Sequence, residues 1–270
     1  MAPIIRTTFA FIFSVLLISC SWNSAEKDFE RAESYDGVKD FRQSVYYYER
    51  VIKRNPESEL ALEAASRAAR IYHLELLEYP KAIEFFKFLI LYSPNPQVRK
   101  QAQQRVAQIY YEKIKDYNQA ILEFNKLLQL KSSDQEKLKY KIAIAHSYYG
   151  LNNFFQANIE IDEILKLPAD ETHRFDVLLF KGNILLTIKK IDEAIVVFNE
   201  LIKKYPDESK KENIWMNLAL CYEEKDDFDR AINILSEIKD EYPMPEFLDM
   251  KIRKLKKRKA NMPGAKGLKR

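Results

Sequence analysis

Few side chains of this 270-residue sequence stand at spacings that could support chemistry. Its three histidines, His73, His146 and His173, are scattered, and none has a second His or Cys at metal-ligand spacing. No Gly-rich phosphate loop and no Gly-x-Ser-x-Gly nucleophile motif occurs. The many carboxylates fall on polar helix faces, where solvation leaves them little functional weight. The sequence therefore predicts that the protein is not an enzyme and has neither a cofactor nor a metal site.

Residues 1–20 have the pattern of an exported protein. One basic residue, Arg6, precedes an apolar run from Phe9 to Ile18. Ten residues are too few for a membrane-spanning helix, which needs about 20, but they fit a secretory signal peptide. The run ends in Leu17-Ile18-Ser19-Cys20, which resembles the lipobox of bacterial lipoproteins.

The lipobox resemblance implies a signal peptide over residues 1–19, cleavage before Cys20 and lipidation of that cysteine. Ser21 follows, and in lipoproteins of double-membraned bacteria a residue other than Asp at this place implies export to the outer membrane. The protein is then expected to be lipid-anchored there and to face the periplasm, with residues 20–24 as a linker. The alternative is an ordinary signal peptide with an incidental cysteine.

Composition favours an all-helical chain. Glycine accounts for only 5 of 270 residues, and no alternating Val/Ile/Thr-rich runs bounded by turns occur, so strands are not expected. Cys20 and Cys221 are the two cysteines, so an acylated Cys20 leaves no partner for an intramolecular disulfide. Cys221 is then expected to be a small buried apolar residue in a helix.

Helical periodicity is clearest between Trp215 and Pro243. Large and small apolar residues lie on one face of each of two successive helices, at Trp215, Leu218, Ala219, Tyr222, Ala231, Leu235 and Ile238. The small Ala219 and Ala231 let the two backbones approach closely. Pro243 ends the second helix because proline has no N–H to donate.

The same pattern recurs along the chain at intervals of 37 or 38 residues. The small residues that open the second helices are Ser44, Ala82, Ala120, Ala157, Ala194 and Ala231. Four residues after each stands a large apolar residue: Tyr48, Phe86, Phe124, Ile161, Phe198 and Leu235. The matching pairs in the first helices are Ala32/Tyr35, Ala69/Tyr72, Ala107/Tyr110, Ala145/Tyr148, Gly182/Leu185 and Ala219/Tyr222. Prolines close most copies, at Pro56, Pro94, Pro168, Pro206 and Pro243, and Ser132 and Ser133 take their place in the third.

This spacing of large and small residues resembles the tetratricopeptide repeat (TPR), a helix–turn–helix unit. The resemblance implies an all-α, right-handed superhelical solenoid of about six repeats over residues 25–243. The period exceeds the usual length of about 34 residues. The extra residues are expected mainly between repeats, as at residues 206–212, with one more in the turns of repeats two and three. Gly37 and Gly150 are expected in turns, and Gly182 at a packing position.

TPR proteins bind other proteins, and the resemblance places their groove on the first helices, at positions five, nine and twelve of each repeat. The candidate groove residues are Arg70, His73, Gln104, Gln108, Tyr111, Ile142, His146, Tyr149, Leu179, Asn183, Leu186 and Met216, with Ser66, Leu220 and Glu223 at further positions of the same register. Such a groove would be polar at its N-terminal end, more apolar towards repeats four to six, and suited to an extended peptide or a helix. Packing between repeats is the alternative role for Tyr111 and Tyr149. No repeat pairs Lys at five with Asn at nine, so the carboxylate clamp of chaperone-binding TPR proteins is not supported.

The C-terminal segment is strongly basic. Residues 251–270 contain ten Lys or Arg and no acidic residue, whereas residues 20–250 carry a net charge of −7. A capping helix over residues 244–259 is expected to cover the last repeat, followed by a basic flexible tail over residues 260–270. The tail either binds an anionic lipid, cell-wall polymer or acidic partner, or is merely solvated. Nucleic acid is not an expected partner of an exported protein.

The sequence thus predicts a scaffold anchored to the outer membrane through Cys20, which binds envelope proteins or peptides in its groove. In size, lipobox and repeat character it resembles the TPR lipoproteins of the outer-membrane β-barrel assembly machinery. That family has about five repeats, and a basic tail is not part of its pattern. TPR lipoproteins of pilus assembly, and wall-associated regulators of envelope enzymes that act through the groove or the tail, are the alternatives.

Overall fold

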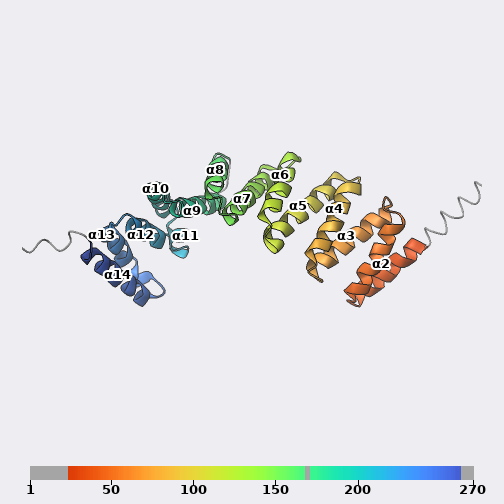
Figure 1. Cartoon of the computed structure of the whole chain (residues 1–270), viewed down its shortest axis with the longest axis horizontal. Coiled ribbons are helices and arrows are strands. Elements are labelled where there is room, and N and C mark those ends of the chain that lie inside the picture. Colours follow the sequence, from red (N-terminus) through yellow and green to blue (C-terminus); the bar gives the residue numbers. More distant parts are fainter. Residues whose placement is uncertain (1–23, 168–170, 263–270) are drawn as a thin grey trace, which may run out of the picture. The chain divides into compact units, whose positions relative to one another are not determined.

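The structure, a computed structural model, describes residues 24–167 and 171–262, and all regular elements within these ranges are helices (Figure 1). A helix over residues 24–37 comes first. The main helices that follow are α2 (Phe41–Arg54), α3 (Glu59–Leu74), α4 (Tyr79–Tyr92), α5 (Pro96–Gln108), α6 (Tyr117–Gln129), α7 (Asp134–Gly150), α8 (Phe154–Ile164), α9 (Glu171–Thr187), α10 (Ile191–Lys204), α12 (Ile214–Glu224), α13 (Phe228–Glu237) and α14 (Pro245–Ala260). Three short elements complete the order: η1 (Ile109–Ile114), α11 (Pro206–Lys211) and η2 (Lys239–Glu241). The prediction of an all-α protein is confirmed for the described residues.

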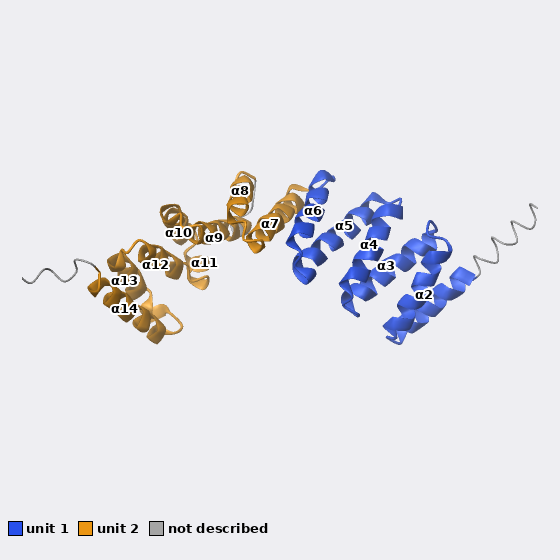
Figure 2. Ribbon diagram, in the orientation of Figure 1, with its two compact units in different colours: residues 1–132 blue, residues 133–270 orange. Residues whose placement is uncertain are grey.

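Consecutive helices pack in pairs, and the chain divides into two compact units (Figure 2). Unit 1 ends at Ser132 and contains the pairs 24–37/α2, α3/α4 and α5–η1/α6. Unit 2 begins at Ser133 and contains α7/α8, α9/α10 and α12/α13, with α14 packed on α13. Six helix–turn–helix repeats and a C-terminal capping helix are therefore present, as the sequence predicts.

The small residues of the repeat pattern lie where two helices approach most closely. All six that open the second helices have no exposed surface: Ser44, Ala82, Ala120, Ala157, Ala194 and Ala231. Gly182 on α9 is in especially close contact with its partner helix, because a Cβ built there would lie 2.5 Å from Cε1 of Phe198 on α10. The predicted packing role of Gly182 thus has a direct cause: only glycine leaves room for the buried Phe198 ring.

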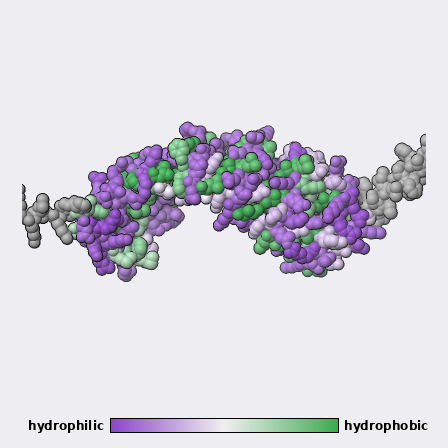
Figure 3. Space-filling model, viewed as in Figure 1, coloured by the Kyte–Doolittle hydropathy of each residue, from purple (hydrophilic) through white to green (hydrophobic). Residues whose placement is uncertain are grey.

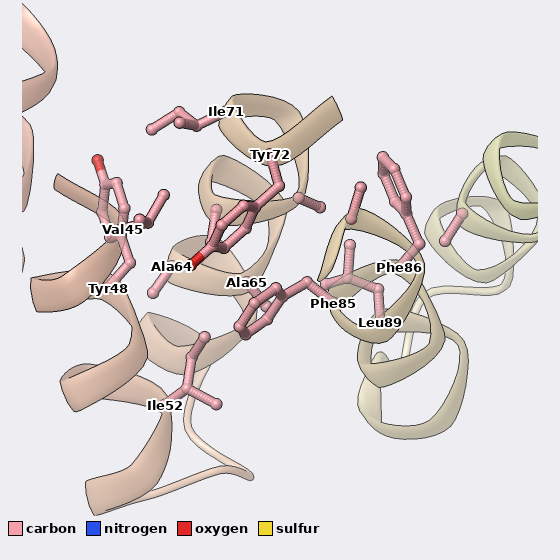
Figure 4. Close-up of a cluster of buried hydrophobic side chains, with 14 of the residues drawn as sticks. Val45, Tyr48, Ile52, Ala64, Ala65, Ile71, Tyr72, Phe85, Phe86 and Leu89 are labelled. Carbon is pink, nitrogen blue, oxygen red and sulfur yellow. The ribbon is translucent and has the colours of Figure 1, made fainter. Parts of the chain in front are cut away.

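Aromatic side chains fill much of the core of unit 1. Figure 4 shows Tyr48 and Ile52 of α2, Tyr72 of α3 and Phe85 of α4 among the side chains between these helices. The rings of Tyr72 and Phe85 stack with centroids 5.7 Å apart, and the Tyr72 hydroxyl donates a hydrogen bond to Glu49 at 2.8 Å. Neighbouring repeats therefore share one continuous core within the unit, as nearest-neighbour packing of a solenoid requires.

Each turn inside a repeat contains one non-glycine residue in the left-handed conformation. These residues, with φ between 56° and 61°, are Lys39, Leu77, Lys115, Asn152, Lys189 and Asp226, each five positions before the small residue of the second helix. The next residue caps that helix through its side chain in four repeats, at Asp40, Asp116, Asn153 and Asp227. The prediction that Gly37 and Gly150 are turn residues is wrong, since each is the last residue of its helix.

The additional residue in repeats two and three is accommodated in two different ways. In repeat two, four residues separate the end of α3 at Leu74 from the start of α4 at Tyr79, as expected. In repeat three the expectation of a longer turn is wrong. There α5 continues into the π-helical turn η1, and only Lys115 and Asp116 precede α6. A π turn holds one more residue than an α turn, so the insertion is absorbed inside the helix.

Unit 2 contains two elements outside the repeat pattern, α11 between repeats five and six and the capping helix α14. Leu248, Ile252 and Leu255 of α14 are buried against Ala219, Phe228, Ala231 and Leu235. Figure 3 shows a mostly hydrophilic surface interrupted by hydrophobic areas. Within the described part of the chain, every helix is too short or too polar to cross a bilayer. The predicted signal peptide over residues 1–19, the lipidated Cys20 and most of the basic tail lie outside the described residues.

Candidate binding groove

A cavity of about 500 Å³ lies on the first helices of repeats four and five in unit 2. Its walls are formed by α7 and α9, with Ile161 of α8 contributing from behind. The lining residues are Lys139, Ile142, His146, Ile161, His173, Asp176, Val177, Leu179, Phe180 and Asn183. Four of them, Ile142, His146, Leu179 and Asn183, are candidate groove residues from the sequence. Repeat register therefore brings positions five and nine of two successive repeats to one opening.

His146 forms an aromatic wall of this cavity together with Phe180. The two rings are stacked, with centroids 4.0 Å apart and planes 16° from parallel. Burial lowers the pKa of His146 below its ordinary value of 6.5, so the side chain is a neutral imidazole at pH 7. A neutral ring over a phenyl ring offers an apolar surface with one donor and one acceptor, and adds no charge to the cavity.

The mouth of the cavity carries polar groups. Lys139 and Asp176 occupy equivalent places, six residues before the small residues Ala145 and Gly182. Asn183 accepts a hydrogen bond from the side chain of Asn217 on α12 at 3.1 Å, which fixes its amide in one orientation. An apolar interior with a few fixed polar groups at its edge suits an apolar side chain whose own backbone needs hydrogen-bond partners.

Three other predicted groove residues of unit 2 contribute to packing instead. Tyr149 lies edge-on to Phe154 of its own repeat at 5.0 Å and to Phe180 of the next at 5.3 Å. Leu186 packs against the core around Phe198, and Met216 against the core around Leu235. Packing between repeats, the alternative role considered for Tyr149, is therefore present in the structure, and none of these three lines the cavity.

The further register positions of repeat six also differ from the expected groove. Glu223, at position twelve, forms ion pairs with Arg258 and Lys251 of the capping helix. Leu220 is half-buried on α12. The capping helix thus neutralises the one acidic residue that the register assigned to the groove.

The predicted groove residues of unit 1 are occupied by contacts within and between repeats. Arg70 donates to Asp36 of the preceding repeat at 2.8 Å, and Gln108 accepts from Arg105 at 3.4 Å. Ser66 is exposed on α3, and Gln104 is half-buried with interactions of its own. The site in unit 1 is therefore a set of engaged polar side chains rather than an open apolar cavity.

The two aromatic candidates of unit 1 pack against second helices. His73 lies edge-on to Tyr79 and Phe86 of α4, and burial, followed by the positive charges of Arg105 and Lys113, lowers its pKa. Tyr111, in the π turn, lies 6.3 Å from Tyr117 and 6.1 Å from Phe124, both on α6. Tyr111 thus packs against the second helix of its own repeat, and burial raises its pKa.

Sequence reasoning missed six of the ten residues around the cavity: Lys139, Ile161, His173, Asp176, Val177 and Phe180. Lys139 and Asp176 carry a usable signal, because they occupy the same place in their repeats. It also missed three further cavities. One, of about 620 Å³, lies between α11 and η2 beside Trp215, and a second, of about 350 Å³, is lined by α10, α12 and α13. The third, of about 440 Å³, lies between α2 and α4 in unit 1. We take the 500 Å³ cavity as the candidate site because the register of the first helices predicts it.

The described residues offer little for catalysis. They contain no group of three or more His, Cys, Asp or Glu side chains that could hold a metal ion. Burial of Cys221 raises the pKa of its thiol to about 11, so the thiolate needed for a nucleophile is scarce at neutral pH. Cys221 is fully buried, as the sequence predicts.

Comparison with known proteins supports the repeat architecture. Residues 185–251 match the family model described as tetratricopeptide repeat. The crystal structure of YrrB, described as a TPR protein with an unusual peptide-binding site, is similar with a TM-score of 0.52 and 16% sequence identity. That match covers 77% of this chain and 97% of YrrB. A tetratricopeptide repeat protein from Parabacteroides merdae matches with a TM-score of 0.51 and 18% identity, over 88% of both chains. No curated protein matches the chain. The fold is thus a TPR solenoid, which indicates a protein-interaction scaffold.

Proposed function

We propose that the protein is a lipid-anchored scaffold of the bacterial outer membrane, which holds a partner protein through the cavity on α7 and α9. The observation that carries the binding role is this cavity of about 500 Å³, which opens on the first helices of two successive repeats. YrrB, which has the same fold, is described as having a peptide-binding site. A peptide or helix of a partner is therefore the ligand that best fits this surface.

The cavity favours a ligand segment with one bulky apolar residue. Ile142, Leu179 and Phe180 would contact that side chain, and burying it would supply most of the binding free energy. The side chains of Lys139 and Asp176 would pair with polar or charged groups on either side of it. Such a site would recognise a short sequence motif of the partner rather than its folded surface.

The anchoring half of the proposal comes from Cys20 and Ser21. Lipoprotein processing would supply the two or three acyl chains that stable anchoring needs, since one chain alone binds a bilayer only marginally. The protein would then face the periplasm and act in outer-membrane protein assembly. Pilus assembly, or the regulation of a wall enzyme, is the second candidate.

Partner capture tests the groove. We would crosslink intact cell envelopes, recover the protein and identify what comes with it, comparing wild type with the double variant Ile142→Ala/Leu179→Ala. Loss of two apolar contacts should weaken capture of the main partner about ten-fold. Substitution of Tyr149 is less informative, because it would also remove the contacts of Tyr149 with Phe154 and Phe180.

The matched control is Ile159→Ala/Val196→Ala, which removes a similar amount of aliphatic side chain from exposed places on α8 and α10. Circular dichroism should show the same helicity for both variants. Unchanged capture by the groove variant, or an equal loss with the control, would contradict a role for the groove. The nature of the captured proteins decides between barrel assembly, pilus proteins and wall enzymes.

Fractionation tests the anchor. Cys20→Ala should block lipidation and release the protein from the outer-membrane fraction under an alkaline wash, which strips proteins held only at the membrane surface, whereas Cys221→Ala should leave its location unchanged. If the Cys20→Ala protein resists that wash as wild type does, the lipoprotein assignment is wrong even where the groove binds as proposed.

A further inference from the structure

The basic residues of α14 fall into two sets. Lys251, Arg258 and Lys259 face the last repeat, where they pair with Glu223 and Asp229. The second set, Arg253, Lys254, Lys256 and Lys257, is exposed and has no acidic partner within 4 Å among the described residues. The first set explains how the cap is held on the repeat. The second set makes no contribution to that contact.

Exposed apolar side chains precede the second set on the same helix. Met244 is 58% exposed, Phe247 41% and Met250 56%. Phe247, Met250, Lys254 and Lys257 follow one another at steps of three, four and three residues, so they form one stripe opposite the buried Leu248, Ile252 and Leu255. In Figure 3 a pale green area lies at the lower left, over the end of unit 2 where Figure 1 places α14.

A cap needs a polar outer face to keep the end of a solenoid soluble. The lysines of α14 meet that need, but the two methionines and the phenylalanine contradict it. Helices that lie at the surface of a bilayer combine apolar residues exposed on one side with lysines on the polar side next to them. There the apolar side chains enter the acyl boundary and the lysines meet lipid phosphates.

We propose that this outer face of α14, formed by Phe247, Met250, Arg253, Lys254 and Lys257, binds the surface of a membrane that contains anionic phospholipids. Charge complementarity supports the assignment, because Glu246 is the one acidic residue of this face without an ion pair, while Asp249 is paired with Lys239 at 2.8 Å. Three of the four unpaired basic residues are lysines, whose point charges suit mobile lipid phosphates, whereas fixed carboxylates of a protein partner favour bidentate arginine.

This membrane contact goes beyond the proposed function and does not depend on it. It uses neither Cys20 nor the cavity on α7 and α9, and it would give the protein a second contact with a bilayer. The sequence beyond residue 262 contains Lys266, Lys269 and Arg270 and no acidic residue. The contact should weaken as salt rises, since charges near a membrane are screened over about 8 Å at physiological ionic strength.

Vesicle co-sedimentation tests the proposal. The protein would begin at Ser21 with its C-terminus intact, because all described contacts involve residues from position 24 onward. We expect it to bind vesicles of phosphatidylglycerol and phosphatidylethanolamine but not vesicles of phosphatidylcholine. Lys254→Gln/Lys257→Gln should weaken this binding about 30-fold, since each lysine near an anionic surface contributes about a factor of five.

The matched control is Lys203→Gln/Lys211→Gln, which removes two exposed lysines without ion pairs from α10 and α11 of the same unit. It should bind nearly as wild type does. A third variant, Phe247→Ser/Met250→Ser, should lose the part of the binding that persists in 0.5 M salt. All substituted side chains are exposed, so circular dichroism should show wild-type helicity for each variant.

Equal loss in the control variant would mean that net charge alone attracts the protein, and it would overturn the proposal. So would equal binding to anionic and neutral vesicles. Absence of binding to both kinds of vesicle would also overturn the proposal. An acidic protein partner would then be the expected ligand of this face. None of these outcomes changes the expectation for capture through the groove or for fractionation of the Cys20→Ala protein.

Discussion

Position nine of the repeat is occupied by Arg70 in unit 1 and by His146 in unit 2, and the surroundings of the two side chains differ. Arg70 is bound to Asp36 of the preceding repeat, whereas His146 lies on Phe180 of the following repeat and lines a cavity. Arg67 likewise pairs with Glu33 of the preceding repeat at 3.1 Å. Arg50 and Arg54 of α2 converge on the buried Asp28 within repeat one.

The first helices of the same repeat fold therefore have different roles in the two units. In unit 1, the ion pairs Arg70–Asp36 and Arg67–Glu33 join successive repeats and engage polar groups of the first helices. In unit 2, apolar and neutral side chains at equivalent places leave an open cavity. Because a paired guanidinium and carboxylate must be desolvated and separated before a ligand can use them, the first helices of unit 1 are a poorer binding surface than those of unit 2. The comparison predicts that substitutions at equivalent positions have different effects in the two units.

The largest expected effect contrasts two glycines. Gly182→Ala in unit 2 should destabilise the protein by about 1–3 kcal/mol, because the added Cβ overlaps the buried ring of Phe198. Gly37→Ala in unit 1 meets nothing within 4 Å, and it should stabilise by up to about 1 kcal/mol through helix propensity. Urea unfolding followed by circular dichroism measures both. Equal and small effects at the two positions would mean that α9 and α10 are not packed as closely as described.

A smaller effect concerns the left-handed turn residues. Unit 1 places Leu77 in this conformation, where an L-residue other than Asn, Asp or Gly is strained, and unit 2 places Asn152 there. Leu77→Asn should therefore raise the free energy of unfolding by about 1 kcal/mol, and Asn152→Leu should lower it by a similar amount. Thermal unfolding of the two exchanged variants is the measurement. A change of the same sign in both would show that the side chains, and not the backbone conformation, decide stability at these turns.

The smallest effect is a pH dependence with two origins. Both His73 and His146 have a lowered pKa in the folded protein, so the unfolded chain takes up protons first as the pH falls through about 6.5. Stability from these groups is thus fully present above pH 6.5 and is lost as the pH falls through the lower folded pKa. His73→Gln and His146→Gln should each reduce this loss, as measured by urea unfolding between pH 7.5 and 5.

Salt distinguishes the two histidines. The pKa of His146 is lowered by burial alone, whereas that of His73 is lowered by burial and by the charges of Arg105 and Lys113. In 0.5 M salt the contribution removed by His73→Gln should shrink, because the two cations are screened, and that removed by His146→Gln should not. The reverse pattern would contradict the assigned causes.

Positions where packing depends on side-chain size could be predicted from the sequence, because each residue type has a known size. Ala194, Gly182 and Phe198 occupy the helix contact that their spacing predicts. The turn conformation at Lys39 or Lys189 could not be predicted, since lysine has no preference for positive φ and the geometry is imposed by the helices on either side. At such turns, tertiary packing determines the backbone conformation.

The candidate site shows the same distinction between residues that the sequence predicts and residues whose role depends on tertiary packing. Register alone predicts Ile142, His146, Leu179 and Asn183, because positions five and nine of a first helix face one way. It does not predict that Tyr149 turns towards Phe180, because that contact depends on a ring supplied by the next repeat. The position of a residue in the repeat predicts the direction in which it faces. The side chains of the adjacent repeat determine whether that residue is available to a ligand.

The π-helical turn at Ile109–Ile114 has a consequence for how such chains change over time. An inserted residue was accepted inside a helix, while Ala107 before it and Ala120 after it both remained fully buried. Copies of the repeat can therefore gain a residue one at a time without breaking the contacts between them. The repeats can thus come to differ in length while the fold is conserved. A sequence alignment that assumes a fixed repeat length then fails at each repeat that has gained a residue. The tetratricopeptide model matches residues 185–251, where the small residues Ala194 and Ala231 keep a spacing of 37.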